Sequence, residues 1–89
     1  MESMRDLEKI LKALANKRRL AILKYLKSRK EASVGEIADE INLSIKSTSR
    51  HLSVLYGAEI LDREQRSLQA FYRLSSTQKS LTKHLLTIL

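Results

Sequence analysis

The stretch SVGEIADEINLSIKSTSRHLSVLYG, residues 33–57, decides the fold of this chain. Ser33 and Glu36 have the Ser-x-x-Glu spacing of a capping box, in which each side chain accepts a hydrogen bond from the other residue's backbone amide. Asn42 can end this helix in a left-handed conformation, and Ser44 can cap the next one. Helical spacing of apolar residues supports the first helix, at Val34, Ile37, Ala38 and Ile41. Two short helices joined by about three residues predict a helix-turn-helix.

The second of these helices, residues 44–57, is unusually rich in short hydroxyl side chains, although Ser and Thr are mediocre helix formers. At about 100° per residue, Thr48, Leu52 and Leu55 share the side that would be buried. The opposite side carries two cations and groups of little bulk, namely Lys46, Arg50, Ser53 and Gly57, flanked by Ser47 and Ser49. Such a face suits the major groove of DNA, where donors must reach phosphates and base edges at close range. The plainer alternative is that these positions are simply solvated.

Three positions in this helix have competing interpretations. Capping is favoured over a DNA contact for Ser44, and a packed or surface-edge histidine is favoured over a base contact for His51. Ile45 either packs inward or touches a thymine methyl group from the first turn, and the sequence does not separate these two possibilities.

The flanking segments predict a small, mainly α-helical domain that spans residues 1–89. A leucine stripe predicts a helix over about 4–15, and Asn16 caps a second helix that ends near Ser28. After Gly57 the alternation of side chains predicts two strands within about 60–74, joined by a hairpin tip near Arg66 and Ser67. Ser75 and Gln78 suggest another capping box, which would open a last helix over about 76–89. The predicted order is α-α-α-α-β-β-α.

In that hairpin, alternation places Leu68, Ala70, Tyr72 and Leu74 on one face. Arg63, Arg66 and Arg73 make it basic, whereas Asp62 and Glu64 dilute the charge. We favour Arg63 and Arg66 as phosphate contacts, and a salt-bridged, solvent-exposed hairpin is the alternative.

Charge and composition limit the classes of function. The formal net charge is +7, and residues 1–30 hold ten Lys or Arg against three acids. A basic domain of this size usually has a polyanionic partner, most often nucleic acid. Residues 17–19 place three cations at a helix start, where the macrodipole opposes positive charge, so a carboxylate or phosphate should compensate. For Lys17 and Arg18 the alternative is an ordinary surface position.

Other functions find little support in the residues present. The chain has no Cys and only two His, His51 and His84, so disulfides and thiolate or histidine-rich metal sites are not expected. We see no spacing typical of a nucleophile and base, no glycine-rich phosphate loop and no cofactor motif, and therefore expect no enzyme. Few aromatic residues leave few platforms for stacking RNA bases. Short apolar runs predict neither a signal peptide nor a membrane span, in keeping with a cytoplasmic protein.

Apolar stripes at both ends of the chain exceed what one small core can cover. Large exposed apolar patches mark interfaces, and we therefore expect a homodimer. The candidate dimerisation residues are Met4, Leu7, Leu11, Leu81, Leu85, Ile88 and Leu89. The alternative is a monomer whose terminal helices fold back over its own core.

The order of elements and five strings together resemble the ArsR/SmtB-type winged helix-turn-helix regulators. The strings are LKALANKRRLAIL (11–23), SVGEIADEINLS (33–44), STSRHLSVL (47–55), GAEIL (57–61) and FYRL (71–74). The resemblance implies a dimeric transcriptional repressor whose fourth helix reads the major groove, whose hairpin wing flanks that helix, and whose terminal helices form the dimer. Carried over by position, the DNA-facing candidates are Ser44, Lys46, Ser47, Ser49, Arg50 and His51 in the helix, and Arg63 and Arg66 in the wing.

The chain departs from that family's pattern in ways that bear on sensing. The segment ASVGEIA (32–38) lacks the family's cysteines, and STQKSLTKHLLTIL (76–89) has one His and no acid, so no metal is expected at either of the family's sites. Glu59 stands where the family commonly has Gly, and the wing lacks its usual turn glycine.

The function that the sequence supports is sequence-specific binding of double-stranded DNA by a homodimeric transcriptional regulator, expected to be a repressor. The alternative is a winged-helix module that docks proteins and carries its charge incidentally.

Overall fold

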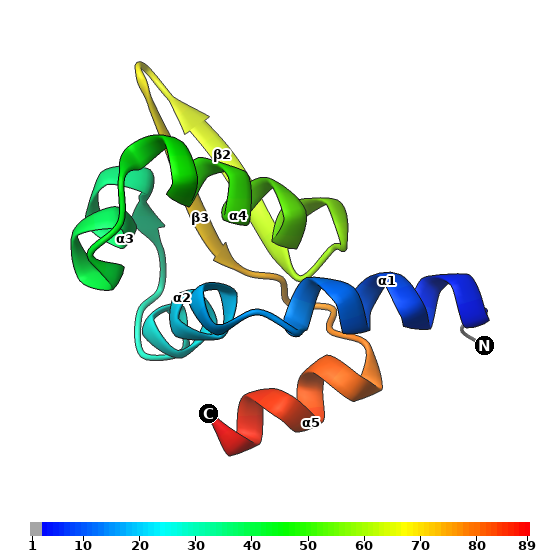
Figure 1. Ribbon diagram of the computed structural model, residues 1–89. Helices are drawn as coiled ribbons and strands as arrows, with labels where there is room; N and C mark the ends of the chain where they lie inside the picture. Colours follow the sequence, from blue (N-terminus) through cyan, green and yellow to red (C-terminus); the bar gives the residue numbers. More distant parts are fainter. Residues whose placement is uncertain (1–2) are drawn as a thin grey trace.

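The computed structural model describes residues 3–89, which form five helices around a small antiparallel sheet (Figure 1). Their bounds, in chain order, are α1 Met4–Leu14, α2 Lys17–Lys27, β1 Ala32–Ser33, α3 Val34–Ile41, α4 Ile45–Gly57, β2 Leu61–Arg66, β3 Gln69–Leu74 and α5 Ser80–Ile88. The mainly helical fold with one hairpin and the order of the predicted elements are confirmed, with one short strand added between α2 and α3.

Local capping explains where the helices begin and end. Asn16 Oδ1 accepts hydrogen bonds from two backbone amides at the start of α2. Ser33 and Glu36 form the complete capping box of α3, and this lowers the pKa of Glu36 because its carboxylate accepts the Ser33 amide. Asn42 ends α3 with a left-handed φ of 54°, and Ser44 Oγ accepts the Ser47 amide to open α4. These four predictions are confirmed.

The sheet has the order β1-β3-β2, and all of its pairs are antiparallel. β1 was not predicted, because two residues carry no alternation; only their pairing with Tyr72 and Phe71 makes them a strand. β2 and β3 form the wing, which projects beyond the helices in Figure 1.

The tip of the wing lies one residue later than expected. Arg66 pairs with Gln69, so the turn is made by Ser67 and Leu68. Ser67 takes a left-handed φ of 55° there, without a glycine. Leu68 is 96% exposed and lies in this turn rather than in the strand, so the prediction that it shares a face with Tyr72 is wrong.

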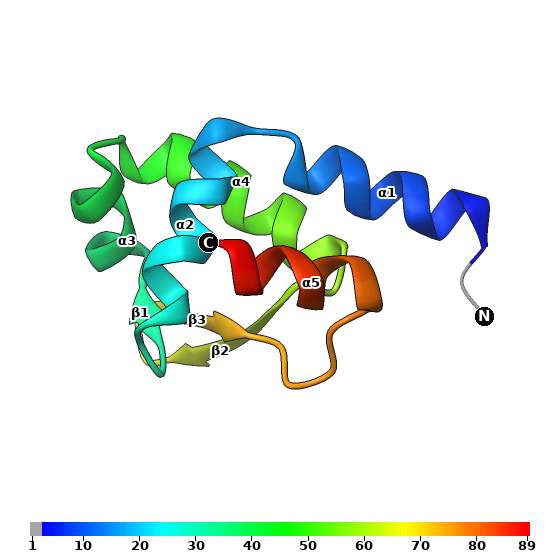
Figure 2. The same cartoon turned by 90° about the horizontal axis from the view of Figure 1, so that it is seen from below.

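The last helix begins at Ser80 rather than near residue 76. The proposed box does not form because the Ser75 amide, which would donate to the Gln78 side-chain oxygen, donates instead to the carbonyl of Ile60 at 3.0 Å, while Gln78 Nε2 donates to the carbonyls of Ile60 and Ser75, both at 2.9 Å. Ser75 Oγ instead accepts the Thr77 amide, which holds this segment as a turn. The shorter α5 lies beside α2 in both views of the molecule (Figures 1 and 2).

The core lies between the helices and the inner face of the sheet. It is formed mainly by α2, α3 and α4 and closed by Leu61 and Tyr72 of the wing strands. The residues buried most completely include Ile22, Leu23, Leu26, Ile37, Leu52, Leu55 and Ile60. Because one side of α4 is buried in this core, the opposite side of that helix faces solvent.

Candidate nucleic-acid interface

Helix α4 exposes the face that the sequence predicted. Thr48, Leu52 and Leu55 are fully buried. On the opposite side, Lys46, Arg50, Ser53 and Gly57 are exposed, while Ser47 and Ser49 are half-buried at its edges. Because α4 contains no Asp or Glu, the positive charges of Lys46 and Arg50 are not offset within the helix. It can offer ammonium, guanidinium and hydroxyl donors to a polyanion without obstruction by bulky side chains.

Ser44 lies at the N-terminal end of this face and is exposed. Its Oγ already accepts the Ser47 amide at 3.1 Å, as the capping interpretation requires. The hydroxyl can still donate a hydrogen bond to a phosphate oxygen, because capping uses only an acceptor lone pair.

His51 turns toward α2 and away from the exposed face. Its Nδ1 lies 3.2 Å from Arg19 Nη1, and the ring is half-buried. Burial lowers the pKa of His51, and the positive charges of Arg19 and Arg18 lower it further. A neutral His51 therefore accepts a hydrogen bond from Arg19, and its ring does not join the DNA-facing candidates Lys46 and Arg50.

Arg18 and Arg19 are compensated in a way that the sequence did not reveal. Arg18 Nη1 donates to the carbonyl of Ile41 at 3.3 Å, at the end of α3. Arg19 donates through Nε and Nη2 to the carbonyls of Ala13 and Lys12, in the last turn of α1. The unfavourable dipole at the start of α2 is thus offset by the C-terminal ends of two other helices, where cations are stabilised.

The two wing arginines proposed as phosphate contacts lie on opposite faces of the hairpin. Arg66 donates to both carboxylate oxygens of Glu31, with Nη2 at 2.8 Å from Oε1, and to Glu64, and it stacks over Phe71 at 4.5 Å. These contacts raise the pKa of Arg66 and lower the pKa values of Glu31 and Glu64. For Arg66 the salt-bridged alternative is the one that the structure supports.

Arg63 lies on the face of the wing that turns toward α4. Its guanidinium carbon is 5.3 Å from the centre of the Tyr56 ring, and the side chain is exposed. Among residues 3–89, no carboxylate lies within ion-pair distance of Arg63. Arg63 therefore extends the basic face of α4 onto the wing.

The seven residues predicted to form a dimer divide into two groups. Met4, Leu11 and Ile88 are exposed to solvent, at 85%, 49% and 69%. The other four are half-buried: Leu7, Leu81, Leu85 and Leu89. Of these, the three in or next to α5 pack partly against the core.

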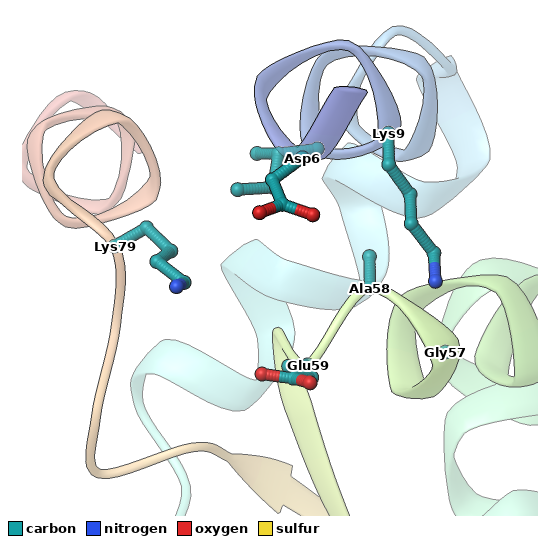
Figure 3. A pocket seen from close by; sticks show the side chains of 7 residues that line it. Asp6, Lys9, Gly57, Ala58, Glu59 and Lys79 are labelled. Carbon is teal, nitrogen blue, oxygen red and sulfur yellow. The ribbon is translucent and has the colours of Figure 1, made fainter. Parts of the chain in front are cut away.

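A mixed-charge cavity of about 120 Å³ lies between α1, the C-terminal end of α4 at Gly57 and the segment before α5. Figure 3 shows Asp6, Lys9 and Lys79 around it, together with the carboxylate of Glu59. Its two acids balance its two lysines, so it does not add to the basic surface. Glu59 has a left-handed φ of 62°, at the position where ArsR/SmtB-type regulators commonly have glycine.

Two further features of the described residues concern metals and membranes. Nowhere in residues 3–89 do three His, Cys, Asp or Glu side chains group in a way that could hold a metal ion. None of the helices in this part of the chain has both the length and the apolar character needed to cross a membrane.

Comparison with known proteins finds similarity to transcriptional regulators that contain a helix-turn-helix. A family model described as a helix-turn-helix domain matches residues 14–64. The transcriptional activator HlyU of Vibrio cholerae is 41% identical over 69 residues, which cover 78% of this chain and 63% of HlyU. The transcriptional repressor SdpR of Bacillus subtilis is 32% identical over 68 residues, or 76% of this chain and 74% of SdpR. The chain thus aligns with less than two thirds of the length of HlyU.

Solved structures agree with the sequence matches. A structure of HlyU from Vibrio cholerae superimposes with a TM-score of 0.81 at 32% identity, covering 99% of this chain and 92% of that one. The homodimeric winged helix-turn-helix DNA-binding domain of a possible ArsR-family regulator from Mycobacterium bovis superimposes with a TM-score of 0.78 at 25% identity, covering 98% and 82%.

Proposed function

The chain belongs to the helix-turn-helix family, among the winged helix-turn-helix regulators of the ArsR/SmtB type, and from this premise we propose that it binds double-stranded DNA sequence-specifically as a homodimer. One observation carries the proposal. The acid-free face of α4 opposite its buried leucines is exposed, with Lys46 and Arg50 at its centre and Arg63 beside it on the wing. Helix α4 would lie in the major groove, with the wing along the backbone or in the adjacent minor groove.

In this arrangement the residues have different tasks. Lys46 from the first turn of α4 and Arg50 from its middle would reach base edges or phosphates, because their side chains are long enough to cross the groove. Ser44, Ser47, Ser49 and Ser53 would contribute hydroxyl donors at short range. Arg63 would contact the phosphate backbone from the wing, whereas Arg66 would hold the wing in place.

The experiment that tests this function is selection of bound duplexes from a random pool by the full-length protein. We expect an inverted repeat whose half-sites are about one DNA turn, roughly 34 Å, apart, since a twofold dimer presents two α4 helices. Recovery of random sequence would contradict specific binding, and recovery of a single unrepeated site would contradict the dimer.

Salt dependence separates this function from that of a protein-docking module. A dimer that neutralises several phosphates should lose about 10³-fold or more in affinity between 50 and 200 mM salt. In the selected operator, Arg50→Ala should weaken specific binding more than binding to random duplex, because only base contacts carry sequence information. Equal losses on both duplexes would assign Arg50 to the backbone.

We further propose that the protein acts by repression, in the cytoplasm beside the chromosomal DNA. A dimer over the operator covers a full turn of duplex or more and would exclude polymerase from an overlapping promoter. One relative is named an activator and the other a repressor. Transcription from a template bearing the selected operator decides between the two: added protein should lower transcript, and increased transcript would overturn repression.

A further inference from the structure

A groove without charged side chains runs between the start of α4 and the tip of the wing. It encloses about 390 Å³ and lies on the side of α4 next to the basic face. Ile45 and Leu68 are its two exposed apolar residues, at 55% and 96%. The other residues that line it are Ser33, Val34, Gly35, Ser49, Gln65, Gln69 and Ala70.

Ile45 is the first residue of α4, a position that calls for no apolar side chain. The cap of the helix is already provided by Ser44, and the buried positions of α4 begin one turn later, with Thr48 and Leu52. Scattered exposed apolar residues are common on protein surfaces and need no explanation by themselves. Ile45 differs because it lies in the groove between the helix and the wing, with Lys46 and Arg50 next to it on the same helix.

The charges around the groove determine what can enter it. Lys46 and Arg50 are exposed on α4 and Arg63 on β2 of the wing, the two elements between which the groove lies, and neither α4 nor the lining of the groove contributes a carboxylate. A polyanion is therefore the occupant that fits, and the N-terminal residues of a recognition helix are those that meet base edges. An isoleucine cannot hydrogen-bond to a base, and so only an apolar contact can give it a preference. Thymine, through its 5-methyl group, is the base that presents such a contact in the major groove.

We propose that Ile45 is a specificity-determining residue that packs against the 5-methyl group of a thymine in each half-site. The proposal rests on the DNA-binding function above and adds the base that this position reads. It also accounts for the exposure of a β-branched residue in a first turn otherwise occupied by Lys46 and Ser47.

The test replaces each thymine of the selected operator by deoxyuridine, which removes the methyl group and leaves the hydrogen-bonding edge unchanged. One symmetric pair of positions should weaken binding of the unmodified protein about 4-fold per half-site, or about 15-fold for both, as expected for one buried methyl group. Ile45→Ala should weaken binding to the thymine duplex to a similar extent and lose its sensitivity to deoxyuridine at that pair.

Val54→Ala is the matched control, because Val54 is also an exposed β-branched residue of α4 but does not line the groove. This variant should keep the full methyl dependence. Ile45→Val should retain most of it, and circular dichroism should show both Ile45 variants folded, since the side chain lies largely outside the core.

The outcomes separate the inference from the function on which it rests. Tight, palindrome-specific binding with no position sensitive to deoxyuridine, or with equal sensitivity in Ile45→Ala, would overturn the role of Ile45 and leave the DNA-binding function standing. Failure to select any duplex would overturn both.

Discussion

At the scale of single residues, Arg63 and Arg66 show how alternation along a strand separates two like side chains. They lie on opposite faces of β2, so Arg66 meets Glu64 and Phe71 on the outer face while Arg63 meets Tyr56 of α4. One partner of Arg66, Glu64, is two residues away on the same face of the strand, whereas the other, Glu31, is 35 residues away in the sequence. Strand alternation could therefore pair Arg66 with Glu64, but no local pattern could reveal the contact with Glu31.

Arg63→Ala should reduce the salt dependence of DNA binding, because a phosphate contact contributes to the slope of log affinity against log salt. We expect the slope to fall by about one per protomer, or about two per dimer. Arg66→Ala is the matched control and should change the slope by less than half as much, since its charge is already paired with Glu31 and Glu64. Titration of labelled operator at several salt concentrations measures both. A larger slope change for Arg66 than for Arg63 would reverse the assignment.

Glu59 has a backbone conformation that residues with a side chain rarely adopt. Its φ of 62° is in the left-handed region, which disfavours residues with a Cβ atom and suits glycine. Glu59→Gly should raise the free energy of unfolding by about 1 kcal/mol, because relief of the strain outweighs the extra freedom of glycine in the unfolded chain. Urea denaturation measures the change. Glu59→Ala is the control: it removes the carboxylate from the cavity of Figure 3 but keeps the Cβ atom, so it should give little of this gain. An equal increase in the free energy of unfolding for Glu59→Gly and Glu59→Ala would assign the effect to the lost charge and not to the backbone.

At the scale of elements, the boundaries that the sequence predicted are those set by local hydrogen bonds. Asn16, Ser33 and Ser44 all cap the helices that they were expected to cap, since a cap involves residues two or three apart. The predicted boundaries are wrong where a residue forms hydrogen bonds with a partner that is distant in the sequence. Gln78 donates to Ile60, 18 residues away, and the two residues of β1 become a strand only through β3.

The exposed face of α4 was likewise predictable from helical periodicity alone, because one buried side determines the other. The surroundings of His51 and Ile45, at the two edges between the buried and exposed sides, were not predictable, since they depend on how α2 and the wing pack against α4. Arg19 fixes His51 from 32 residues away, and the groove of the wing tip leaves Ile45 exposed.

Arg19 joins three helices, and the burial of His51 beside its positive charge makes the stability of the domain depend on pH. Because the folded state lowers the pKa of His51 from its ordinary value of 6.5, the unfolded state binds more protons just below that pH. The contribution is fully present above 6.5 and falls as the pH drops below 6.5 toward the folded pKa. The urea midpoint should therefore decrease between about pH 7.5 and 5.5.

The variant His51→Gln should flatten this dependence, because an amide oxygen can still accept from Arg19 but does not titrate. His84→Gln, which changes the exposed histidine of α5, is the control for replacing a histidine that does not contact Arg19. If His51→Gln retains the full decrease of the midpoint, the titrating group lies elsewhere.

At the scale of the whole molecule, the two terminal helices leave apolar surface that the domain itself does not cover. α1 extends past the body of the domain, and its outer residues Met4 and Leu11 face solvent (Figures 1 and 2). Ile88, near the end of α5, is exposed as well. A twofold partner that covered these residues would also fix the spacing of the two α4 helices, so affinity for an inverted repeat and dimerisation should be lost together.

Ile88→Glu should convert the dimer to a folded monomer and lower operator affinity roughly tenfold or more, because one recognition helix would then bind without the second. The side chain is 69% exposed, so the charge should not disturb the monomer's core. Sedimentation equilibrium at tens of micromolar protein measures the mass, and operator titration measures the affinity. Leu68→Glu, which places the same charge on the exposed wing tip, should weaken DNA binding without changing the mass. A protein that is already monomeric before substitution, or an Ile88→Glu variant that stays dimeric, would show that the terminal helices do not form the interface.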